Sequence, residues 1–268
     1  MTKHIDTYDQ GVCDTYKEIS AYKWDDRFCC RKCGNETFFE GKTPYSRRCS
    51  KCKTYESVTA HTALNKLRIP LPIAVDIIRQ IANGMKKPFS KQSVKDMEVK
   101  YGIEMRERTY LDFVKKIMLL TKEQHSFFER VTVFNIEYGN FNILLFKGKT
   151  ENGGKYFACV YKGSTVEMNN LIEQCCQPGT LKVICTGKMN KTEYDFEIIH
   201  RDPNAKSDNY IYDFLLELWI WLPGIDSITS TQEEIQMYLD AFIFARNRNG
   251  DGYKNFMKIL VTDFSRME

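Results

Sequence analysis

The chain lacks a long apolar run. Its most apolar helical stretch, residues 211–222, is interrupted by Asp213 and Glu217, and it is shorter than the roughly 20 residues that span a bilayer. The first ten residues are polar, so we expect no signal peptide at this end. Low-complexity tracts and internal repeats are also missing. We therefore predict a protein without a membrane partner that lies in the cytoplasm, or on the nucleoid if the cell is bacterial.

The ten cysteines are not expected to form disulfides, because thiols stay reduced in the cytoplasm. Four of them have the spacing of metal ligands. The other six are expected to be ordinary small residues of the core or the surface. These six are Cys13, Cys29, Cys159, Cys175, Cys176 and Cys185.

Four cysteines follow the pattern C-x2-C-x15-C-x2-C, which is typical of a zinc site. They are Cys30, Cys33, Cys49 and Cys52. Each CxxC turn directs two thiolate sulfurs at one point, and two such turns complete a tetrahedron with Zn–S distances of about 2.3 Å. Gly34 suits the first turn because glycine tolerates a positive φ. Four thiolates leave no open position, so we predict a structural zinc ion; chance spacing of free cysteines is the alternative.

Charge is divided unevenly along the chain. Residues 1–122 carry 24 Lys and Arg against 15 Asp and Glu, a net charge of +9. Residues 123–268 carry 15 Lys and Arg against 20 Asp and Glu, a net charge of −5. The basic part is where a polyanion such as double-stranded DNA would bind. A solvated surface without a ligand is the alternative.

The predicted zinc ribbon is itself basic. Residues 37–40 and 45–48 are expected to form two short strands between the cysteine pairs. The ribbon carries seven basic residues and two acidic ones, Glu36 and Glu40, and such a basic face suits contacts to phosphate groups. The seven are Arg31, Lys32, Lys42, Arg47, Arg48, Lys51 and Lys53. The predicted DNA-binding residues among them are Arg31, Lys32, Arg47, Arg48 and Lys51. A small domain that is merely soluble is the alternative.

Apolar periodicity predicts helices in the remainder of the first half. They run over residues 5–24, 70–83, 92–101 and 105–120. A short helix, a turn that contains glycine and a longer helix make the helix-turn-helix plan. The recognition helix would present Arg106, Arg108 and Thr109 to DNA at its N-terminal end. Three packed helices that do not bind DNA explain the pattern equally well.

After residue 121 the sequence becomes rich in strands. Strands are predicted over residues 131–138, 141–147, 155–162, 181–185 and 196–200, and helices over residues 166–177, 208–222 and 230–246. Three antiparallel strands, then alternating helix and strand, then helices is the order of an RNase H-like domain. The prediction is thus a multidomain α+β protein: an N-terminal helix with the zinc ribbon at 1–56, a helix-turn-helix region at 57–124, and an RNase H-like α/β domain at 125–268.

Three further motifs lie outside the cysteine pattern. They are Trp24-Asp25-Asp26-Arg27-Phe28, the pair Ser57-Val58-Thr59-Ala60 and Lys66-Leu67-Arg68-Ile69-Pro70-Leu71, and Tyr238-Leu239-Asp240-Ala241-Phe242-Ile243-Phe244 followed by Arg246-Asn247-Arg248. Together with the ribbon, these motifs resemble the zinc-ribbon insertion-sequence transposases of the ISXO type, which have an RNase H-like catalytic core. The resemblance covers nearly the whole chain.

The resemblance also implies a catalytic site, in which two Asp and a Glu or Asn hold two divalent metals for phosphoryl transfer. The matching positions here are Phe134, Thr186 and Glu217, so two of the three ligands are replaced. No Asp occurs between residues 131 and 192. We therefore expect no catalytic Mg²⁺, and we expect Glu217 to be buried against Phe134.

These observations predict a transposase-derived DNA-binding protein that has lost catalysis, with structural zinc as its cofactor. It would act as a regulator or architectural factor and would bind double-stranded DNA, with a homodimer as one arrangement. Two alternatives stay open. The first is an active two-metal transposase with unrecognised ligands. The second is a scaffold whose acidic RNase H-like domain docks a protein partner.

Overall fold

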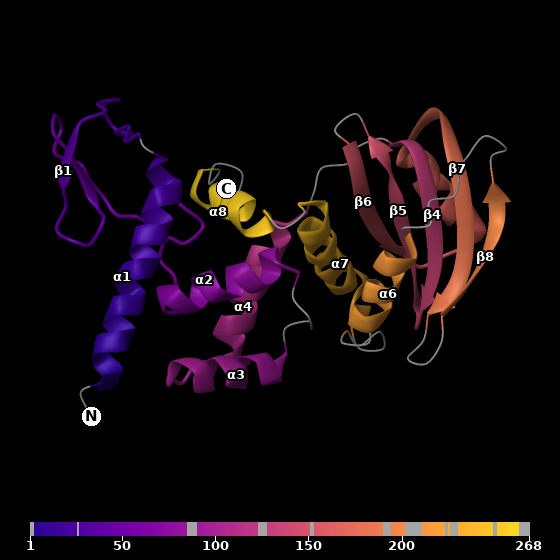
Figure 1. Ribbon diagram of the computed structural model, residues 1–268, viewed down its shortest axis with the longest axis horizontal. Coiled ribbons are helices and arrows are strands. Elements are labelled where there is room, and N and C mark those ends of the chain that lie inside the picture. The colour runs from indigo at the N-terminus through magenta and orange to yellow at the C-terminus, as the bar shows by residue number, and fades with distance from the viewer. Residues whose placement is uncertain are drawn as a thin grey trace. The chain divides into compact units, whose positions relative to one another are not determined.

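The computed structural model describes residues 3–25, 27–84, 90–122, 128–150, 153–189, 194–201, 211–222, 225, 230–248 and 251–262. These residues form a mixed α+β structure with eight helices and two β-sheets (Figure 1). The chain separates into two compact units. The first comprises Met1–Gln80, Lys91–Phe113 and Tyr253–Glu268, and the second comprises Ile81–Ser90 and Val114–Gly252. The division into three domains at residues 56 and 124 stays a prediction.

The N-terminal helix and a small sheet belong to the first unit. Helix α1 spans Lys3–Trp24, close to the predicted 5–24. The sheet is antiparallel and consists of β1 (Phe38–Glu40), β2 (Arg47–Cys49) and β3 (Tyr55–Glu56), in that order. Both predicted strands are present, but Tyr45 has a positive φ of 56° and lies in the turn before β2. The structure adds β3, which the sequence does not predict.

Three helices follow, as predicted. They are α2 (Leu71–Ala82), α3 (Lys91–Tyr101) and α4 (Glu107–Leu119). The Asp76 carboxylate joins α2 to α3, because it accepts hydrogen bonds from Lys100 Nζ at 2.6 Å and from the Tyr101 hydroxyl at 3.2 Å. Gly102 follows α3 with a φ of 64°, and five residues separate α3 from α4.

The structure adds a helix to the two that are predicted at the end of the chain. This helix, α8, spans Gly252–Thr262. Its buried side chains recur at helical spacing and are Phe256, Met257, Leu260 and Val261. The backbone of α8 accepts a hydrogen bond at Leu260 O from Ala63 N at 3.0 Å, and the Tyr253 hydroxyl donates to Glu18 at 2.7 Å. The far end of the sequence thereby completes the core of the first unit.

The second unit contains a five-stranded sheet with the order β6-β5-β4-β7-β8. Its elements are β4 (Phe128–Tyr138), β5 (Phe141–Thr150), β6 (Gly153–Tyr161), α5 (Thr165–Gln174), β7 (Cys176–Met189) and β8 (Tyr194–Arg201). Strands β4, β5 and β6 are antiparallel, and α5 then carries the chain across to β7, which is parallel to β4. Strand β8 returns antiparallel beside β7.

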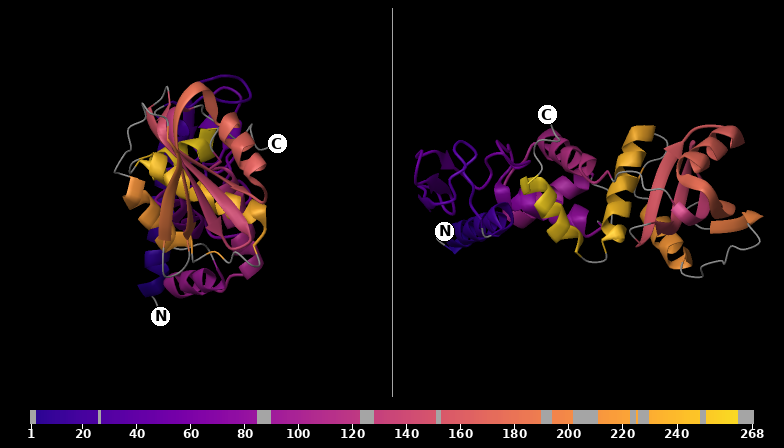
Figure 2. Two further views of the ribbon diagram at one scale, coloured as in Figure 1. Left: turned by 90° about the vertical axis from the view of Figure 1, so that its right-hand side faces the viewer. Right: turned by 90° about the horizontal axis from the view of Figure 1, so that it is seen from above.

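Helices cover both faces of this sheet (Figures 1 and 2). Helices α6 (Ile211–Trp221) and α7 (Gln232–Asn247) pack on the face that holds Phe134, Ile136 and Tyr138. Helix α5 packs on the opposite face, with Val131 and Val133. Successive side chains of a strand point to opposite faces, and this alternation sends Phe134 into the larger of the two cores. The Tyr138 hydroxyl supports that core by donating to Leu222 O and Ile225 O, both at 2.6 Å.

One predicted helix ends earlier than expected, and part of another lies outside the described residues. The predicted helix 166–177 ends at Gln174, because Pro178 disfavours the helical conformation of Gln177 and β7 begins at Cys176. Residues 208–210 of the predicted helix 208–222 lie outside the described part of the chain, as do Asp26, Pro223 and Gly224. Within the part that is described, no helix is long and apolar enough to cross a membrane.

Candidate metal centre and basic surface

Two copies of one local turn build the candidate metal centre. In the first copy, Cys30 O accepts a hydrogen bond from Gly34 N at 2.8 Å, and Cys30 N donates to Asn35 O at 2.9 Å. In the second copy, Cys49 O accepts from Lys53 N at 3.1 Å, and Cys49 N donates to Thr54 O at 2.9 Å. The residue after each pair has a positive φ, 67° at Gly34 and 61° at Lys53. The expected conformation of Gly34 is therefore confirmed, and Lys53 repeats it with a side chain.

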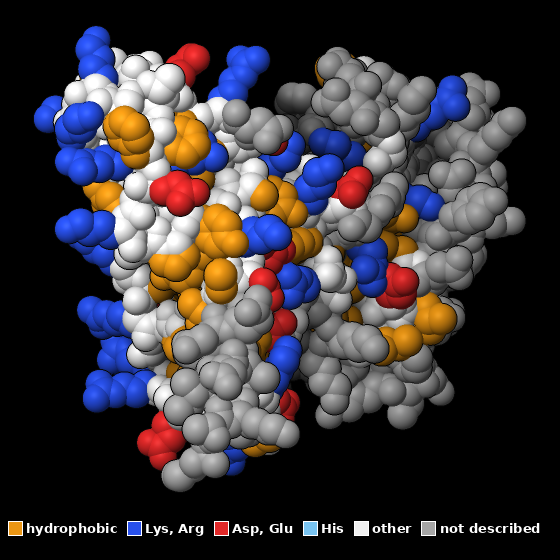
Figure 3. Space-filling view, turned by 60° about the vertical axis from the view of Figure 1, so that its left-hand side comes forward, with side chains coloured by type: hydrophobic (Ala, Val, Ile, Leu, Met, Phe, Trp, Pro, Cys, Tyr) orange, Lys and Arg blue, Asp and Glu red, His pale blue; other side chains and the backbone are white. Residues whose placement is uncertain are grey.

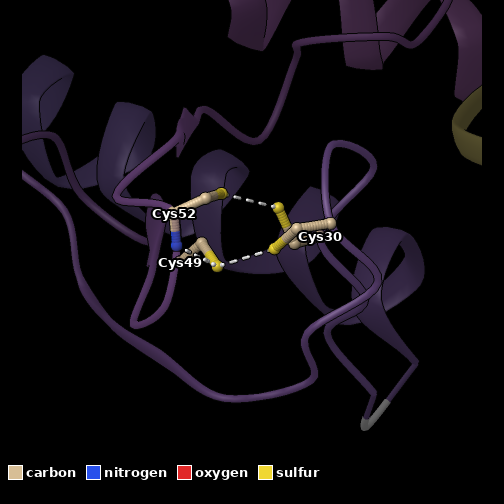
Figure 4. A group of neighbouring side chains, drawn as sticks. Cys30, Cys49 and Cys52 are labelled. Carbon is tan, nitrogen blue, oxygen red and sulfur yellow. Dashed lines mark hydrogen bonds between the residues drawn. The ribbon is translucent and has the colours of Figure 1, made fainter.

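The four sulfurs of these turns converge, and Figure 4 labels Cys30, Cys49 and Cys52 among them. Cys30 Sγ lies 3.5 Å from Cys52 Sγ, and Cys33 Sγ lies 3.6 Å from Cys49 Sγ. All four sulfurs lie within 4.8 Å of one another. Four thiolates around one zinc ion at about 2.3 Å would stand roughly 3.8 Å apart. Cys30 and Cys49 are buried, and this group could hold a metal ion such as zinc.

Two of the thiols have pKa values that are shifted in opposite directions. The pKa of Cys52 is lowered to about 6, first by its hydrogen bond with the Thr54 hydroxyl, whose oxygen lies 3.1 Å from the sulfur. The pKa of Cys33 is raised to about 11: the backbone hydrogen bond at Asn35 lowers it, but burial and the hydrogen bonds with the other three thiols raise it more. A divalent cation that bound this cluster would displace the protons of its thiols.

The inner face of the small sheet packs against the end of α1. The Arg47 guanidinium carbon lies 4.4 Å from the Trp24 ring centroid and 4.1 Å from the Phe38 ring centroid, as in a cation–π sandwich. On the same face of the sheet, Lys23 Nζ lies 2.8 Å from Glu56 Oε1. Arg47, a predicted DNA-binding residue, is therefore half-buried against two rings. The sequence gives no signal for the Lys23–Glu56 pair, because its partners are far apart in the chain.

The other predicted DNA-binding residues of the ribbon, Arg31, Lys32, Arg48 and Lys51, are exposed. Figure 3, in which the side of the molecule that carries the ribbon comes forward, shows exposed hydrophobic side chains among Lys and Arg side chains. No ion pair within the described residues engages six ribbon cations, which are Arg31, Lys32, Lys42, Arg48, Lys51 and Lys53. Their charge is thus open to an anionic partner.

The predicted recognition helix begins near its expected position. Arg106 and Arg108 are exposed at the start of α4, whereas Thr109 is half-buried. Arg108 Nε lies 3.8 Å from Asp112 Oδ2, one turn further along, in a pair that is exposed to solvent. An exposed pair of this kind contributes little to stability and exchanges readily for another anion.

The three positions that match transposase ligands differ in their surroundings. Phe134 is buried in the core under α6 and α7. In the register of β4 and β7, Phe134 pairs with Cys185 and Asn135 pairs with Thr186, whose side chain lies outside the description. The expected burial of Glu217 is wrong: its side chain is 50% exposed, and its Oε2 accepts a hydrogen bond from Arg246 Nε at 2.5 Å.

Helical periodicity explains the position of Glu217. The buried side chains of this region are Phe214, Leu215, Leu218, Trp221 and Leu222. They form one stripe at i, i+1, i+4, i+7 and i+8, and position 217 falls at the edge of this stripe, where a side chain is partly exposed. Among the side chains that the structure describes, the four cysteines form the one group of three or more His, Cys, Asp or Glu that could hold a metal ion.

Comparisons of the chain with protein-family models, with curated proteins and with solved structures found no match.

Proposed function

We propose that this chain is a DNA-binding protein of transposase descent, in which a zinc ribbon and a helix-turn-helix contact double-stranded DNA and the catalytic site has been lost. The observation that carries the proposal is the cluster of four cysteine sulfurs, surrounded by exposed cations without ion-pair partners among the described residues. Such a protein would act as a regulator or an architectural factor.

A structural zinc ion is the metal that best suits this cluster. Its donor set is four thiolates in two tight turns, and such closed sites stabilise a fold instead of activating a water molecule. The ion would tie the turn at Cys30 to the turn at Cys49 and so fix the small sheet that carries the basic residues.

Two further features support DNA as the ligand. Arg106, directly before α4, and Arg108, in its first turn, are exposed at the end of the helix from which a recognition helix contacts bases or phosphates. The net charge of +9 over residues 1–122, against −5 over the remainder, directs a polyanion to the same half of the chain.

The strand order of the second unit supports descent from an RNase H-like core, and the residues at its metal-ligand positions support the loss of catalysis. Its strand order β6-β5-β4-β7-β8, with three antiparallel strands and a parallel crossover through α5, suits that interpretation. Two-metal phosphoryl transfer needs carboxylates from separate elements around the ions. Here Phe134 contributes a buried ring, and Glu217 is half-exposed and pairs with Arg246 of α7.

A salt titration of duplex binding tests the proposal. Fluorescence anisotropy of the full chain with a labelled duplex should show binding that weakens as salt rises, because bound phosphates release counterions. Arg106→Ala and Arg108→Ala should each weaken binding by about 1–3 kcal/mol if they contact a base, or flatten the salt slope by about one unit if they contact a phosphate.

Arg130→Ala is the matched control, because Arg130 is an exposed arginine on the sheet of the second unit. It should change neither the affinity nor the slope. Absence of duplex binding at low salt, or equal losses in all three variants, would favour the protein-docking scaffold instead.

A further inference from the structure

A row of three side chains crosses the outer face of the small sheet. The strand register pairs Phe39 with Arg48 and Arg48 with Tyr55. Directly paired residues of neighbouring antiparallel strands point to the same face. The neighbouring row, which contains Arg47 and Glu56, points to the opposite face, toward α1. The outer ribbon face, defined here by Phe39, Arg48 and Tyr55, therefore has an arginine on its central strand and an aromatic residue on each side of it.

The two rings are exposed and yet held in place. Phe39 is 56% exposed and Tyr55 is 43% exposed. The Tyr55 ring lies over Gly41, where an added Cβ would come within 2.6 Å of it, and its hydroxyl is hydrogen-bonded to Thr43. Lys53 Nζ lies 5.1 Å from the centroid of the Phe39 ring. Rings that are ordered before a ligand arrives lose little conformational freedom on binding.

Exposed aromatic side chains are confined to this part of the described chain. Among the side chains that the structure describes, the exposed large aromatic residues are Phe38, Phe39, Tyr45 and Tyr55, of which Phe39 and Tyr55 belong to the outer ribbon face. The other exposed large apolar residues are aliphatic: Val99, Leu119, Val166, Leu216 and Ile220. Folding alone does not favour exposed rings, and a cluster of them indicates a binding surface.

We propose that the outer ribbon face binds single-stranded DNA, with unpaired bases stacked on Phe39 and Tyr55 and the phosphate backbone held by Arg48 and the neighbouring ribbon lysines. Aromatic rings stack on bases only where the faces of the bases are open, which a duplex does not allow. The cations without ion-pair partners favour a polyanion over a protein surface. This inference rests on the proposed DNA-binding function and adds a second form of DNA to it.

The test uses the full, metal-loaded chain and an oligothymidylate of about 12 nucleotides, a length within the range of single-strand sites. Phe39→Leu and Tyr55→Leu keep an apolar side chain but remove the ring. Each should weaken binding of the single strand about ten-fold, within the usual range for one stacked base, and leave duplex binding nearly unchanged. Val99→Ala, which removes an exposed aliphatic side chain from α3, is the control and should change neither.

A second variant keeps the ring and reports stacking directly. Phe39→Trp should bind the single strand at least as tightly as the parent, and the added indole emission should be quenched on binding. One metal ion per chain in every variant shows that the ribbon has folded. If a variant binds no metal, its ribbon has not folded and Arg48→Gln is measured in its place. Arg48→Gln should also weaken single-strand binding.

Equal single-strand affinity in the parent, Phe39→Leu and Tyr55→Leu would overturn the inference, as would tighter binding to an RNA of matched sequence. The proposed duplex function fails separately. If duplex binding is absent while single-strand binding depends on the two rings, the single-strand site on the outer ribbon face is supported and the proposed duplex function fails. If duplex binding is present and the single strand does not bind, the outer ribbon face is not a DNA site.

Discussion

Lys23 Nζ lies 2.8 Å from Glu56 Oε1, and the two side chains are only 4% and 10% exposed. The same ammonium group donates to Ser57 O at 2.7 Å and to Ala60 O at 2.6 Å. Burial lowers the pKa of Lys23, and the hydrogen bond to Glu56 opposes that shift. One side chain near the end of α1 thus satisfies three acceptors in and after β3.

Lys23→Met should lower the free energy of unfolding by about 3–5 kcal/mol, because it leaves a buried carboxylate without its partner. The double variant Lys23→Met with Glu56→Leu should lose less than the sum of the two single variants. Chemical denaturation of all four proteins measures this coupling. Lys17→Met, an exposed position on the same helix, is the control. Additive losses would mean that the two side chains are not coupled.

The cysteine cluster predicts the metal content of the protein, and a neighbouring cysteine outside the cluster provides the control. Cys49→Ser should abolish metal binding, because it removes a buried member of the cluster. Cys29→Ser changes an exposed cysteine directly before Cys30 and should keep one zinc ion per chain. Elemental analysis of both purified proteins and the parent measures the ratio. A parent protein without zinc, or equal zinc in both variants, would contradict the assignment.

The repeated turn predicts opposite effects at its two equivalent positions. Lys53 adopts a φ of 61°, which costs a residue with a side chain about 1–2 kcal/mol relative to glycine. Lys53→Gly relieves this strain in the folded, metal-loaded protein, but glycine also gives the unfolded chain more conformational freedom. The net effect should be a rise of about 0.5–1 kcal/mol in the free energy of unfolding. Gly34→Ala, at the position with a φ of 67°, should lower it by about 1 kcal/mol. Calorimetry at constant zinc concentration compares the variants.

Local patterns predict this molecule best. The spacing of the cysteines locates the metal centre because each pair sits in one short turn, closed by bonds such as that between Gly34 N and Cys30 O. The Lys23–Glu56 and Glu217–Arg246 pairs join distant segments, so they depend on packing that spacing does not reveal. The outer ribbon face depends on strand register, because one residue of slippage would turn Phe39 inward.

Helical periodicity bears on two of the misses. The apolar stripe of α6 begins with Phe214 and Leu215 and places position 217 at its edge, so it does not predict a buried Glu217. Helix α8 has a comparable stripe that begins with Phe256 and Met257, but the Asn-Gly-Asp-Gly run before it suggests that the ordered chain has ended.

The start of α7 carries a pH-dependent contribution to stability. Thr231 and Glu234 form a capping box, and Lys115 Nζ donates to Glu234 Oε1 at 2.8 Å. The hydrogen bond from Lys115, followed by that from the Thr231 backbone, holds the pKa of Glu234 below 4.5. A carboxyl with a lowered pKa stabilises the fold above its ordinary pKa and loses that contribution as the pH falls through the folded value.

Glu234→Gln should therefore destabilise the protein by about 0.2–1 kcal/mol at neutral pH, the range of a partly exposed ion pair. The difference should vanish as the pH falls below 4.5 and through the lowered value. Urea denaturation at a series of pH values measures it. Lys115→Met should remove most of the same pH dependence, and a difference that grows as the pH falls would contradict the sign.

The last prediction concerns catalysis. The full chain should not nick supercoiled DNA in the presence of Mg²⁺ or Mn²⁺, because the position that matches the first metal ligand is Phe134, which is 3% exposed in the core. Glu217 is half-exposed and is paired with Arg246. Glu217→Gln should consequently leave any background nicking unchanged, and it should cost at most about 1 kcal/mol of stability, as expected for an exposed pair.

Phe134→Asp should destabilise the second unit instead of restoring activity, since it buries a charge among apolar side chains. Metal-dependent nicking that Glu217→Gln abolishes would show that the enzyme is active and that Glu217 is one of its metal ligands.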